Sequence, residues 1–571
     1  MNRLKVAWPW MAAIASGVLL ALCYPPFEGD ALIWIWQAPL LTALWFSKDT
    51  IRNWSRWKHG LVLGYLCGFA FFAINVSWIT QISRVAESFW AGLFALLALS
   101  IYLAIYFGIF GAFAATVGRW IIREPDKNKK DLFDQSIEVL KVAFLNGAAW
   151  CGLEWLRGVV FTGFGWNGLG VALKDHLLLV QFADVIGING YGFIMMFSGI
   201  IAFATLVRLG LEIKERQRLR PHVDFAVGVA LIIGLFLYGT TRITRVPSDS
   251  IDLRARIMQL NIPIEDKWSE DLKLRQKIIF DYRDLTRTFT ETSPHDLILW
   301  PETSIPGVFS LDWVQQYFNE HVLKGDDFYL LTGIEEANYI ENDSLGASEV
   351  YNTITLMKGS TEGYQMYKKI HLVPLGEFIP FRDVVPVFEW VAGGIIQKDF
   401  TPGESYEPLV IQKDEHAIDI IPLICFEDTV PRHARRFVRS SPQIMVNVTN
   451  DGWFGESAQS LQHFHNAIFR CIEFRRPMIR AANTGVSAFV DPRGSVFSRK
   501  EQDGFARILR DGESGSTFIR GSLPGTVEVD LAPPITLYTR AGDLFSITLG
   551  AIALLFSGFS ILGKLNRRET T

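Results

Sequence analysis

Three short stretches of this sequence each present a residue that could take part in acyl transfer. The stretch "LILWPETSIP" presents Glu302, "YKKIHLVPLGEF" presents Lys369 and Glu377, and "IIPLICFEDTVP" presents Cys425. A cysteine attacks as its thiolate, its pKa falls beside a lysine, and a nearby carboxylate can accept its proton. A lysine ammonium also stabilises the oxyanion of a tetrahedral intermediate. These residue types together predict a complete acyl-transfer site without a histidine.

Each of these residues, taken alone, also has a more ordinary explanation. A single cysteine at the end of an apolar strand is usually part of the core, and a glutamate after Trp-Pro often belongs to a turn. The pair Lys368–Lys369 also fits a solvated face. The positions are more informative, because each residue follows a strand-like run, and catalytic groups in α/β sheets gather at the carboxyl ends of strands.

The segment that carries these residues, about 246–541, predicts a soluble α/β domain. Short runs with strand composition alternate with polar or helical stretches, which indicates buried sheets covered by helices. The segment 457–476 predicts a helix. The expected strands lie at 255–262, 296–302, 328–334, 350–357, 417–427, 442–451 and 485–492.

The rest of the chain predicts an integral membrane α-helical bundle of about eight spans. Of the 571 residues, 49% are hydrophobic and 20% are charged. A helix of about 20 apolar residues crosses a hydrocarbon core of about 30 Å. Segments of about this length lie at 8–25, 31–47, 60–80, 89–118, 137–159, 190–209, 224–242 and 544–563. The first is followed by "CYPPFEGD", which is not a small-residue cleavage site, so it is expected to be retained.

The expected domains follow from this division. They are a bundle of seven spans at 1–245, the α/β domain at 246–541, and an eighth span with its tail at 542–571. Basic residues are frequent at both ends of the chain and in every second loop, whereas "PPFEGD" and "QISRVAES" are poor in them. Since cytoplasmic loops carry the excess of Lys and Arg, both termini are expected in the cytoplasm. In a bacterium with two membranes, the chain would cross the inner membrane and hold its α/β domain in the periplasm.

Two charged residues fall inside an expected span. Glu154 and Arg157 lie in the segment "LNGAAWCGLEWLRG". Charges within a membrane are rare and usually functional. Alternatively, both residues lie at the interface beside Trp150 and Trp155. The sequence leaves both interpretations open.

Five motifs resemble one known superfamily. "WPETSIP", "YKKIHLVPLGEFIPF", "CFEDTVP", "NDGWFG" and "RPMIRAANTGVSAFVDPRG" follow one another with the spacing of a domain. They resemble the nitrilase superfamily, whose fold is an αββα sandwich and whose catalytic residues are Glu, Lys and Cys. Together with eight spans, and with "EWLRG" and "GFGWNGLG", the chain is similar to the apolipoprotein N-acyltransferase family. That family transfers an acyl chain from a phospholipid to the N-terminal amine of diacylglyceryl-cysteine lipoproteins, the last step of lipoprotein maturation.

The resemblance implies a role for each matching residue. Cys425 corresponds to the nucleophile that becomes a thioester, Glu302 to the general base, and Lys369 to the residue that stabilises the oxyanion. Glu377 corresponds to a second glutamate that fixes Lys369 by a hydrogen bond. Glu427 corresponds to an acidic residue with an ordering or substrate-binding role.

Four aromatic residues belong to the same expected site. The backbone N–H of Phe426 would complete the oxyanion hole, although the family often has Tyr at this position. Trp268 resembles an aromatic residue near the substrate entrance, and a packed core Trp explains it equally well. Trp453 and Phe454, in "NDGWFG", are either a tight turn or a mobile hydrophobic flap over the acyl site.

The resemblance also defines the expected partners. They are the membrane, a phospholipid acyl donor, expected to be phosphatidylethanolamine, and a diacylglyceryl apolipoprotein acceptor. No cofactor and no metal are expected, because "HFH" at 463–465 has no evident third ligand. A net charge of −4 gives no sign of nucleic-acid binding. Two alternatives remain: a membrane-tethered nitrilase or amidase that hydrolyses a carbon–nitrogen bond, and a non-catalytic receptor or transporter.

Overall fold

The computed structural model divides the chain into two compact units. It describes residues 2–47, 54–121, 130–215, 221–267, 269, 271–291, 293–339, 347–380, 382, 398–496 and 507–569. The first unit comprises Met1–Ile79, Phe94–Thr244 and Arg540–Thr571, and the second comprises Thr80–Leu93 and Arg245–Thr539. The second unit therefore includes a short segment that lies between two membrane helices in the sequence.

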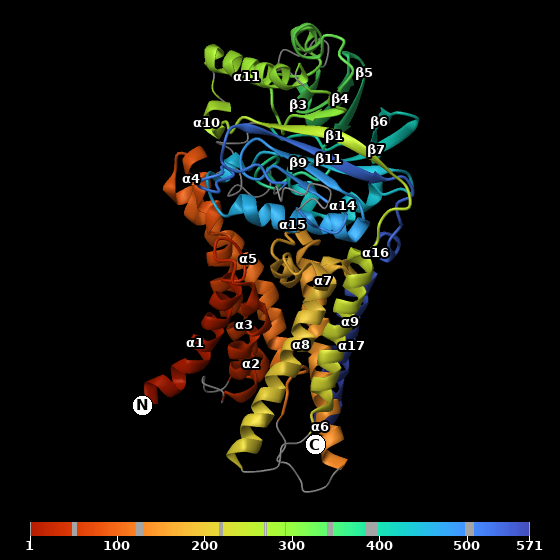
Figure 1. Cartoon of the computed structure of the whole chain (residues 1–571). Helices are drawn as coiled ribbons and strands as arrows, with labels where there is room; N and C mark the ends of the chain where they lie inside the picture. The colour runs from red at the N-terminus through yellow and green to blue at the C-terminus, as the bar shows by residue number, and fades with distance from the viewer. Residues whose placement is uncertain are drawn as a thin grey trace. The chain divides into compact units, whose positions relative to one another are not determined.

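Among the described residues, six helices are long and apolar enough to cross a membrane. Mean hydropathy is highest in the helix that begins at Phe89, because its 26 residues include no charged side chain. The helices run side by side in Figure 1. They are α3 (Arg56–Asn75), α5 (Phe89–Ala114), α6 (Lys130–Arg157), α8 (Ala183–Lys214), α9 (Val223–Ile243) and α17 (Leu544–Glu569).

The first two expected spans form shorter apolar helices. In α1 (Asn2–Ala21), the apolar part is Val6–Ala21. The segment 31–47 is interrupted at Ile35, between the 3-10 helix η1 (Asp30–Trp34) and α2 (Gln37–Phe46). The 10 residues of α2 extend about 15 Å, half the thickness of a hydrocarbon core. A continuous apolar composition therefore did not guarantee a continuous helix.

Glycines bring the helices of the first unit close together. A Cβ on Gly152 of α6 would lie 2.5 Å from the Cα of Gly550 in α17. A Cβ on Gly64 of α3 would lie 2.2 Å from the carbonyl oxygen of Phe107 in α5. Since lipid gives apolar helices no solvent-driven reason to associate, such close backbone packing is a main source of their attraction.

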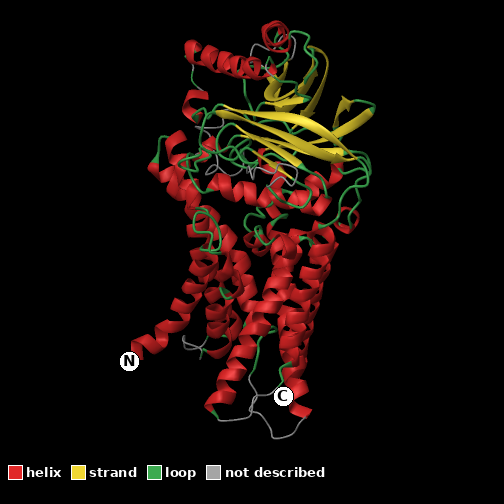
Figure 2. Cartoon of the chain, in the orientation of Figure 1, coloured by secondary structure: helices red, strands yellow, loops and turns green. Residues whose placement is uncertain are grey.

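The second unit contains two β-sheets with helices outside them (Figure 2). One sheet has the strand order β11-β1-β2-β3-β4-β5, and the other has the order β10-β9-β8-β7-β6. The strands are β1 (Ser250–Gln259), β2 (Leu297–Leu299), β3 (Tyr329–Tyr339), β4 (Ala347–Lys358), β5 (Ser360–Lys368), β6 (Leu409–Lys413), β7 (His416–Ile424), β8 (Gln443–Thr449), β9 (Met478–Ala482), β10 (Ala488–Val490) and β11 (Gly521–Asp530).

The hydrophobic cores confirm the expected αββα sandwich. One core contains buried residues of both sheets, such as Leu297 and Ile420, and continues to Phe464 on α15 (Gln459–Phe474). The other joins the first sheet to Tyr282 on α11 (Leu272–Thr290) and Phe318, which follows α12 (Asp312–Tyr317). Each sheet therefore packs one face on the other sheet and one face on helices.

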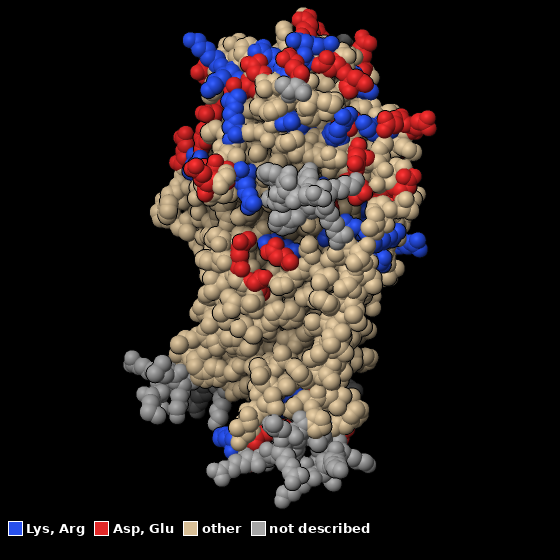
Figure 3. All heavy atoms as spheres, viewed as in Figure 1, with Lys and Arg blue, Asp and Glu red and all other residues tan. Residues whose placement is uncertain are grey.

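The central strands of each sheet run parallel, and Glu302 and Cys425 follow the ends of two of them, β2 and β7. Strands β1, β2 and β3 are parallel, as are β7, β8 and β9. Parallel sheets are buried on both faces, which explains the continuous apolar sequence of β7 and β8. Charged side chains gather over the second unit in Figure 3, whereas the helices of the first unit present a largely uncharged surface.

Candidate active site

Glu302 lies three residues beyond the end of β2, in a tight turn. The next residue, Thr303, has a φ of 47°, in the left-handed region that side chains disfavour. A Cβ on Gly333 would lie only 2.5 Å from the Glu302 Cα, so a glycine is needed opposite the turn. Glu302 is 7% exposed, and its Oε1 accepts a hydrogen bond from Asn352 Nδ2 at 2.8 Å. Burial raises the pKa of its carboxyl group, and the positive charge of Lys369 opposes that rise.

Lys369 directly follows β5 and is 1% exposed. Its Nζ donates a hydrogen bond to Glu377 Oε1 at 2.8 Å. The other oxygen of Glu377 accepts from the N–H of Val373 at 2.8 Å. Burial alone would lower the pKa of Lys369, but the negative charges around it, that of Glu377 above all, outweigh burial and raise the pKa. The ammonium therefore remains charged, and Glu377 holds it in place.

Cys425 is the first residue after β7, at the start of the 3-10 helix η6 (Cys425–Thr429). Its φ of 51° is left-handed, a conformation that costs energy for any residue with a Cβ and that clusters at functional sites. Its carbonyl oxygen accepts from Asn447 Nδ2 at 3.1 Å. Burial raises the pKa of the thiol, Glu302 raises it further, and Lys369 lowers it. The resting sulfur is therefore a thiol, and forming the thiolate requires a nearby proton acceptor.

Glu427 connects the segments that carry Lys369 and Cys425. Its side chain is fully buried, and Oε1 accepts from the N–H groups of Ile370 and His371, both at 2.9 Å. Its Oε2 accepts from the N–H of Ile424 at 2.9 Å. A carboxylate with these partners orders the end of β7 against the end of β5. Of the two roles weighed for Glu427, this geometry supports the ordering role.

The expected aromatic residues have different surroundings. Phe426 is half-buried and stacks on the His371 ring, with centroids 6.1 Å apart. Burial, with Arg432 nearby, lowers the pKa of His371 to about 3, so this imidazole is neutral at physiological pH. Trp268 lies outside the described residues. Trp453 and Phe454 are half-buried in the 3-10 helix η8 (Asp451–Phe454).

A buried ionic cluster beneath Cys425 was missed by the sequence analysis. The nitrogens of His463 lie 2.9 Å from Asp428 Oδ1 and 2.9 Å from Asp451 Oδ1. Arg480 forms ion pairs with both aspartates and donates to Asn447 Oδ1 at 2.9 Å. Since Asn447 also holds the Cys425 carbonyl, the cluster supports the strained residue. Its members lie in four separate stretches of the sequence that were each noted for other reasons, and no one stretch shows that they meet.

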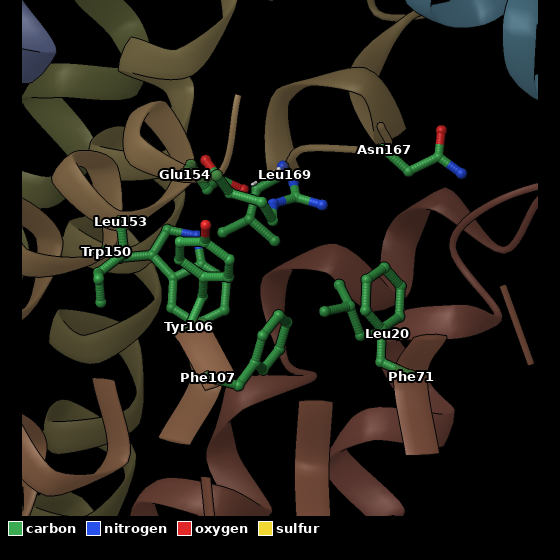
Figure 4. Close-up of a pocket in the computed structure, with 10 residues that line it drawn as sticks. Leu20, Phe71, Tyr106, Phe107, Trp150, Leu153, Glu154, Asn167 and Leu169 are labelled. Atoms are coloured by element: carbon green, nitrogen blue, oxygen red, sulfur yellow. Dashed lines mark hydrogen bonds between the residues drawn. The ribbon is translucent and has the colours of Figure 1, made fainter. Parts of the chain in front are cut away.

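Glu154 and Arg157 are buried within the first unit, at 6% and 4% exposure. Glu154 Oε1 accepts from the N–H of Leu169 at 2.9 Å, and Arg157 Nη1 donates to the Trp166 carbonyl at 2.9 Å. Both residues line a pocket within this unit. Figure 4 shows the rings of Phe71, Tyr106, Phe107 and Trp150 around it. Neither charge therefore faces lipid or water on the outer surface of the unit.

Comparisons with known proteins match both halves of the chain. Residues 16–201 match the family described as the apolipoprotein N-acyltransferase N-terminal domain, and residues 254–504 match the carbon-nitrogen hydrolase family. A solved structure of a variant of the Nesterenkonia AN1 amidase, from the nitrilase superfamily, is 17% identical. It covers 52% of this chain and 98% of its own, with a TM-score of 0.32.

Two relatives named apolipoprotein N-acyltransferase align over nearly the full length. The protein from Geobacter metallireducens is 29% identical over 540 residues, which is 94% of this chain and 92% of the relative. The protein from Rhodopseudomonas palustris is 29% identical over 562 residues, which is 96% of this chain and 95% of the relative. With both halves matched and the relatives aligned almost throughout, the chain belongs to the apolipoprotein N-acyltransferase family, within the nitrilase superfamily.

Proposed function

We propose that this protein transfers an acyl chain from a phospholipid to the N-terminal amine of a diacylglyceryl-cysteine lipoprotein. The observation that carries the proposal is the strained Cys425, which lies within electrostatic reach of Glu302 and Lys369. Within the part of the chain that the structure describes, six helices can cross a membrane, where both lipid substrates reside. The name of the aligned relatives supports the same activity.

In the first half-reaction, Cys425 takes the acyl group. Its Sγ attacks the ester carbonyl carbon of the phospholipid while Glu302 accepts the thiol proton. The oxyanion that forms is stabilised by the Lys369 ammonium and the backbone N–H of Phe426. When the intermediate collapses, the carbon–oxygen bond to glycerol breaks, and the leaving oxygen takes the proton from Glu302. The products are a Cys425 thioester and a lysophospholipid.

In the second half-reaction, the α-amine of the acceptor attacks the thioester. Glu302 accepts a proton from the attacking nitrogen, and Lys369 again stabilises the oxyanion. The carbon–sulfur bond breaks because a thiolate leaves more readily than an amide nitrogen. The proton returns to Cys425, and the lipoprotein keeps the acyl chain as an amide.

The electrostatics of the site support Glu302 as the base. Burial raises the pKa of both the Glu302 carboxyl and the Cys425 thiol. A raised pKa makes Glu302 a stronger proton acceptor than a carboxylate in water, whereas a resting thiolate would need no acceptor. The Lys369 ammonium is positively charged and is held in place by its ion pair with Glu377. The site therefore contains the positive charge that would stabilise the oxyanion.

The membrane bundle gives the proposed reaction a physical setting. Moving an acyl chain into water costs about 0.8 kcal/mol per CH₂ group, and a chain that stays in the apolar phase avoids that cost. We infer an inner-membrane location, with both termini in the cytoplasm and 246–541 as a periplasmic catalytic domain. The bundle would consist of 1–245 and 542–571. The donor would be phosphatidylethanolamine.

The test is the mass of the intact protein after incubation with phosphatidylethanolamine and no acceptor. The proposal requires the gain of one acyl group, located on the Cys425 peptide and removed by hydroxylamine. A diacylglyceryl-cysteine peptide should then take up that group. Cys425→Ala should stay unlabelled, and Cys471→Ala, which changes a fully buried cysteine of the core, should label normally.

Two results would overturn the proposal. If acceptor is modified while Cys425 never carries an acyl group, the transfer is direct and Cys425 is not the nucleophile. If the acyl group passes to water and the acceptor peptide stays unmodified, the protein is a hydrolase, as the match of its second half to the carbon-nitrogen hydrolases would then indicate.

A further inference from the structure

A second buried lysine lies beside Glu302. Lys267 is the last residue of α10 (Ile264–Lys267) and is 5% exposed. Its Nζ donates a hydrogen bond to the backbone carbonyl oxygen of Glu302 at 2.7 Å. Burying an ammonium is unfavourable unless opposite charge or hydrogen bonds compensate it. The position of Lys267 therefore calls for a functional explanation.

The carbonyl that Lys267 binds belongs to the strained turn at Glu302. On one side, the N–H of Gly333 donates to the carbonyl of Pro301 at 3.1 Å, and the glycine leaves no room for a side chain. On the other side, Lys267 binds the next carbonyl along the chain. The turn is thus held by β3 on one side and by Lys267 of α10 on the other, and the Glu302 side chain starts from a defined position.

Two carboxyl groups face Lys267, those of Glu302 and Glu335. Burial lowers the pKa of Lys267 to about 8 although both carboxyl groups oppose this, so the ammonium is charged at neutral and acidic pH. The other titratable or charged groups nearby are Lys369 and Glu377 around Glu302, Cys425 and Glu427 beside Lys369, Arg275 beside Glu335, and Glu265, Asp266 and Arg84 at α10.

Lys369 alone does not offset the two carboxyl groups of Glu302 and Glu377. Glu302 and Glu377 contribute two negative charges, and Lys369 contributes one positive charge through its contact with Glu377. Without a second cation, two carboxylates would share one ammonium, and one of them would take up a proton more readily. Glu302 lacks an ion-pair contact of its own among the described residues, so it would be the one protonated.

We infer that Lys267 is a positioning residue for Glu302. It holds the main chain of the turn, and its charge keeps the Glu302 side chain in the ionised form that accepts the Cys425 proton. This inference rests on the role proposed above for Glu302. It predicts that removal of the charge shifts the pH dependence of acylation and does not only lower its rate.

The experiment compares Lys267→Met and Lys267→Gln, which lose the charge, with Lys267→Arg, which keeps it. The rate of acyl-enzyme formation is measured at saturating phosphatidylethanolamine, without acceptor, from about pH 5 to pH 9. An opposite charge at short range lowers a carboxyl pKa by about 1–3 units. On the acidic side of the pH–rate profile, the pH at which the acylation rate falls should therefore rise by about one unit or more in both neutral variants. The rate in this pH range should drop about tenfold or more. Lys267→Arg should keep the wild-type profile.

A matched control and a second readout separate the possible results. Lys277→Met removes an exposed lysine of α11 and should leave the profile unchanged. The carboxylic-acid infrared band that Glu302→Gln lacks should titrate at higher pH in Lys267→Met, whether or not the enzyme turns over. If both neutral variants lose rate equally at every pH, or if the Glu302 band does not move, the inference is overturned. If wild type forms no acyl-enzyme while the band shifts as expected, the proposed function fails and the coupling of Lys267 to Glu302 stands.

Discussion

At the scale of single residues, the proposed nucleophile Cys425 has a strained backbone, and burial raises the pKa of the proposed base Glu302. The left-handed Cys425 and the buried Glu302 are both unfavourable arrangements that the surrounding fold must enforce. Glu427 and the Asp428–His463–Asp451–Arg480 cluster supply that support, because they hold the backbone on both sides of the thiol. Function and stability therefore depend on neighbouring but different side chains.

Removal of the base or of the ammonium should abolish acylation without unfolding the protein. Glu302→Gln keeps the shape of the side chain but cannot accept the thiol proton. Lys369→Met removes the charge that stabilises the oxyanion, and loss of one such donor slows a reaction about 10²–10³-fold. The rate of acyl-enzyme formation measures both effects. Lys368→Met is the control, since the Lys368 ammonium lies over the Tyr351 ring and not in the site. Near-normal acylation in either active-site variant would exclude that residue from the proposed mechanism.

The cluster around His463 should make stability depend on pH. Burial lowers the pKa of His463, but Asp428 and Asp451 outweigh this and raise it above the unfolded value of about 6.5. A raised folded pKa means that the stabilisation is complete below about pH 6.5 and is lost as pH rises through the folded pKa. His463→Gln should therefore lower Tm most at acidic pH, by an amount on the order of 10 °C if about 3–5 kcal/mol is lost.

Thermal unfolding of wild type and His463→Gln, followed in detergent across this pH range, checks that expectation. His416→Gln, which changes an exposed residue at the start of β7, is the control and should show no pH-dependent difference. A difference in Tm that stays constant or grows with rising pH would mean that His463 is neutral in the folded protein.

The sequence revealed those site residues that sit in short motifs at strand ends. Glu302, Lys369, Glu377, Cys425 and Glu427 all follow apolar runs, so their types and positions were visible. Asn352, which donates to both Glu302 and Glu377, lies within β4 and looks like an ordinary polar residue of an alternating strand. The roles of Lys267 and Arg480 depend on contacts with segments far away in the sequence, and no local pattern predicts those contacts.

At the scale of elements, the predictable parts were those with a strong local pattern. The seven expected strands overlap observed ones, whereas β5, β6, β9 and β11 lie outside the expected ranges. In β11, Pro524 and two glycines argue against a strand, but β11 is an edge strand, where a proline is tolerated. The segment Thr80–Leu93 was assigned to the membrane half, yet it belongs to the second unit, where Arg84 pairs with Glu265 at 2.8 Å.

Helix packing in the first unit predicts which glycines tolerate a methyl group. Gly152→Ala would place a Cβ 2.5 Å from the Gly550 Cα, so α6 and α17 would have to move apart. Overpacking of this kind costs about 1–3 kcal/mol. Gly558→Ala, also on α17, is the matched control, because nothing lies within 4 Å of the added atom. Tm in detergent should fall for Gly152→Ala and stay within error for Gly558→Ala, and equal values would show that the helices have room to adjust.

At the scale of the whole molecule, the unit boundaries and the charge pattern lead to the same topology. Thr80–Leu93 and Arg245–Thr539 form one compact unit, so they must lie on the same side of the membrane. Four long apolar helices, α5, α6, α8 and α9, separate these two segments, and an even number of crossings returns the chain to the same side. The loop that contains Thr80–Leu93 is also one of those poor in basic residues, which are expected outside the cytoplasm.

Reporter fusions can test this topology and decide whether α1 and α2 cross the membrane. A fusion after Thr571 should report the cytoplasm and an insertion near Pro247 the periplasm, since α17 is the one long apolar helix among the described residues between the two positions. These results are the same for six or eight spans, because α1 and α2 change the number of spans as a pair.

An insertion after Phe27, between α1 and α2, decides whether these two helices cross. A periplasmic reporter means that both cross, and a cytoplasmic reporter means that neither does. We expect the periplasm, because basic residues lie at the start of α1 and follow α2, whereas the stretch around Phe27 has none. A fusion after Glu215, in the basic loop that follows α8, is the cytoplasmic control. If the Pro247 and Thr571 reporters lie on the same side, α17 does not span the membrane, and if that side is the cytoplasm, the proposed periplasmic domain is wrong.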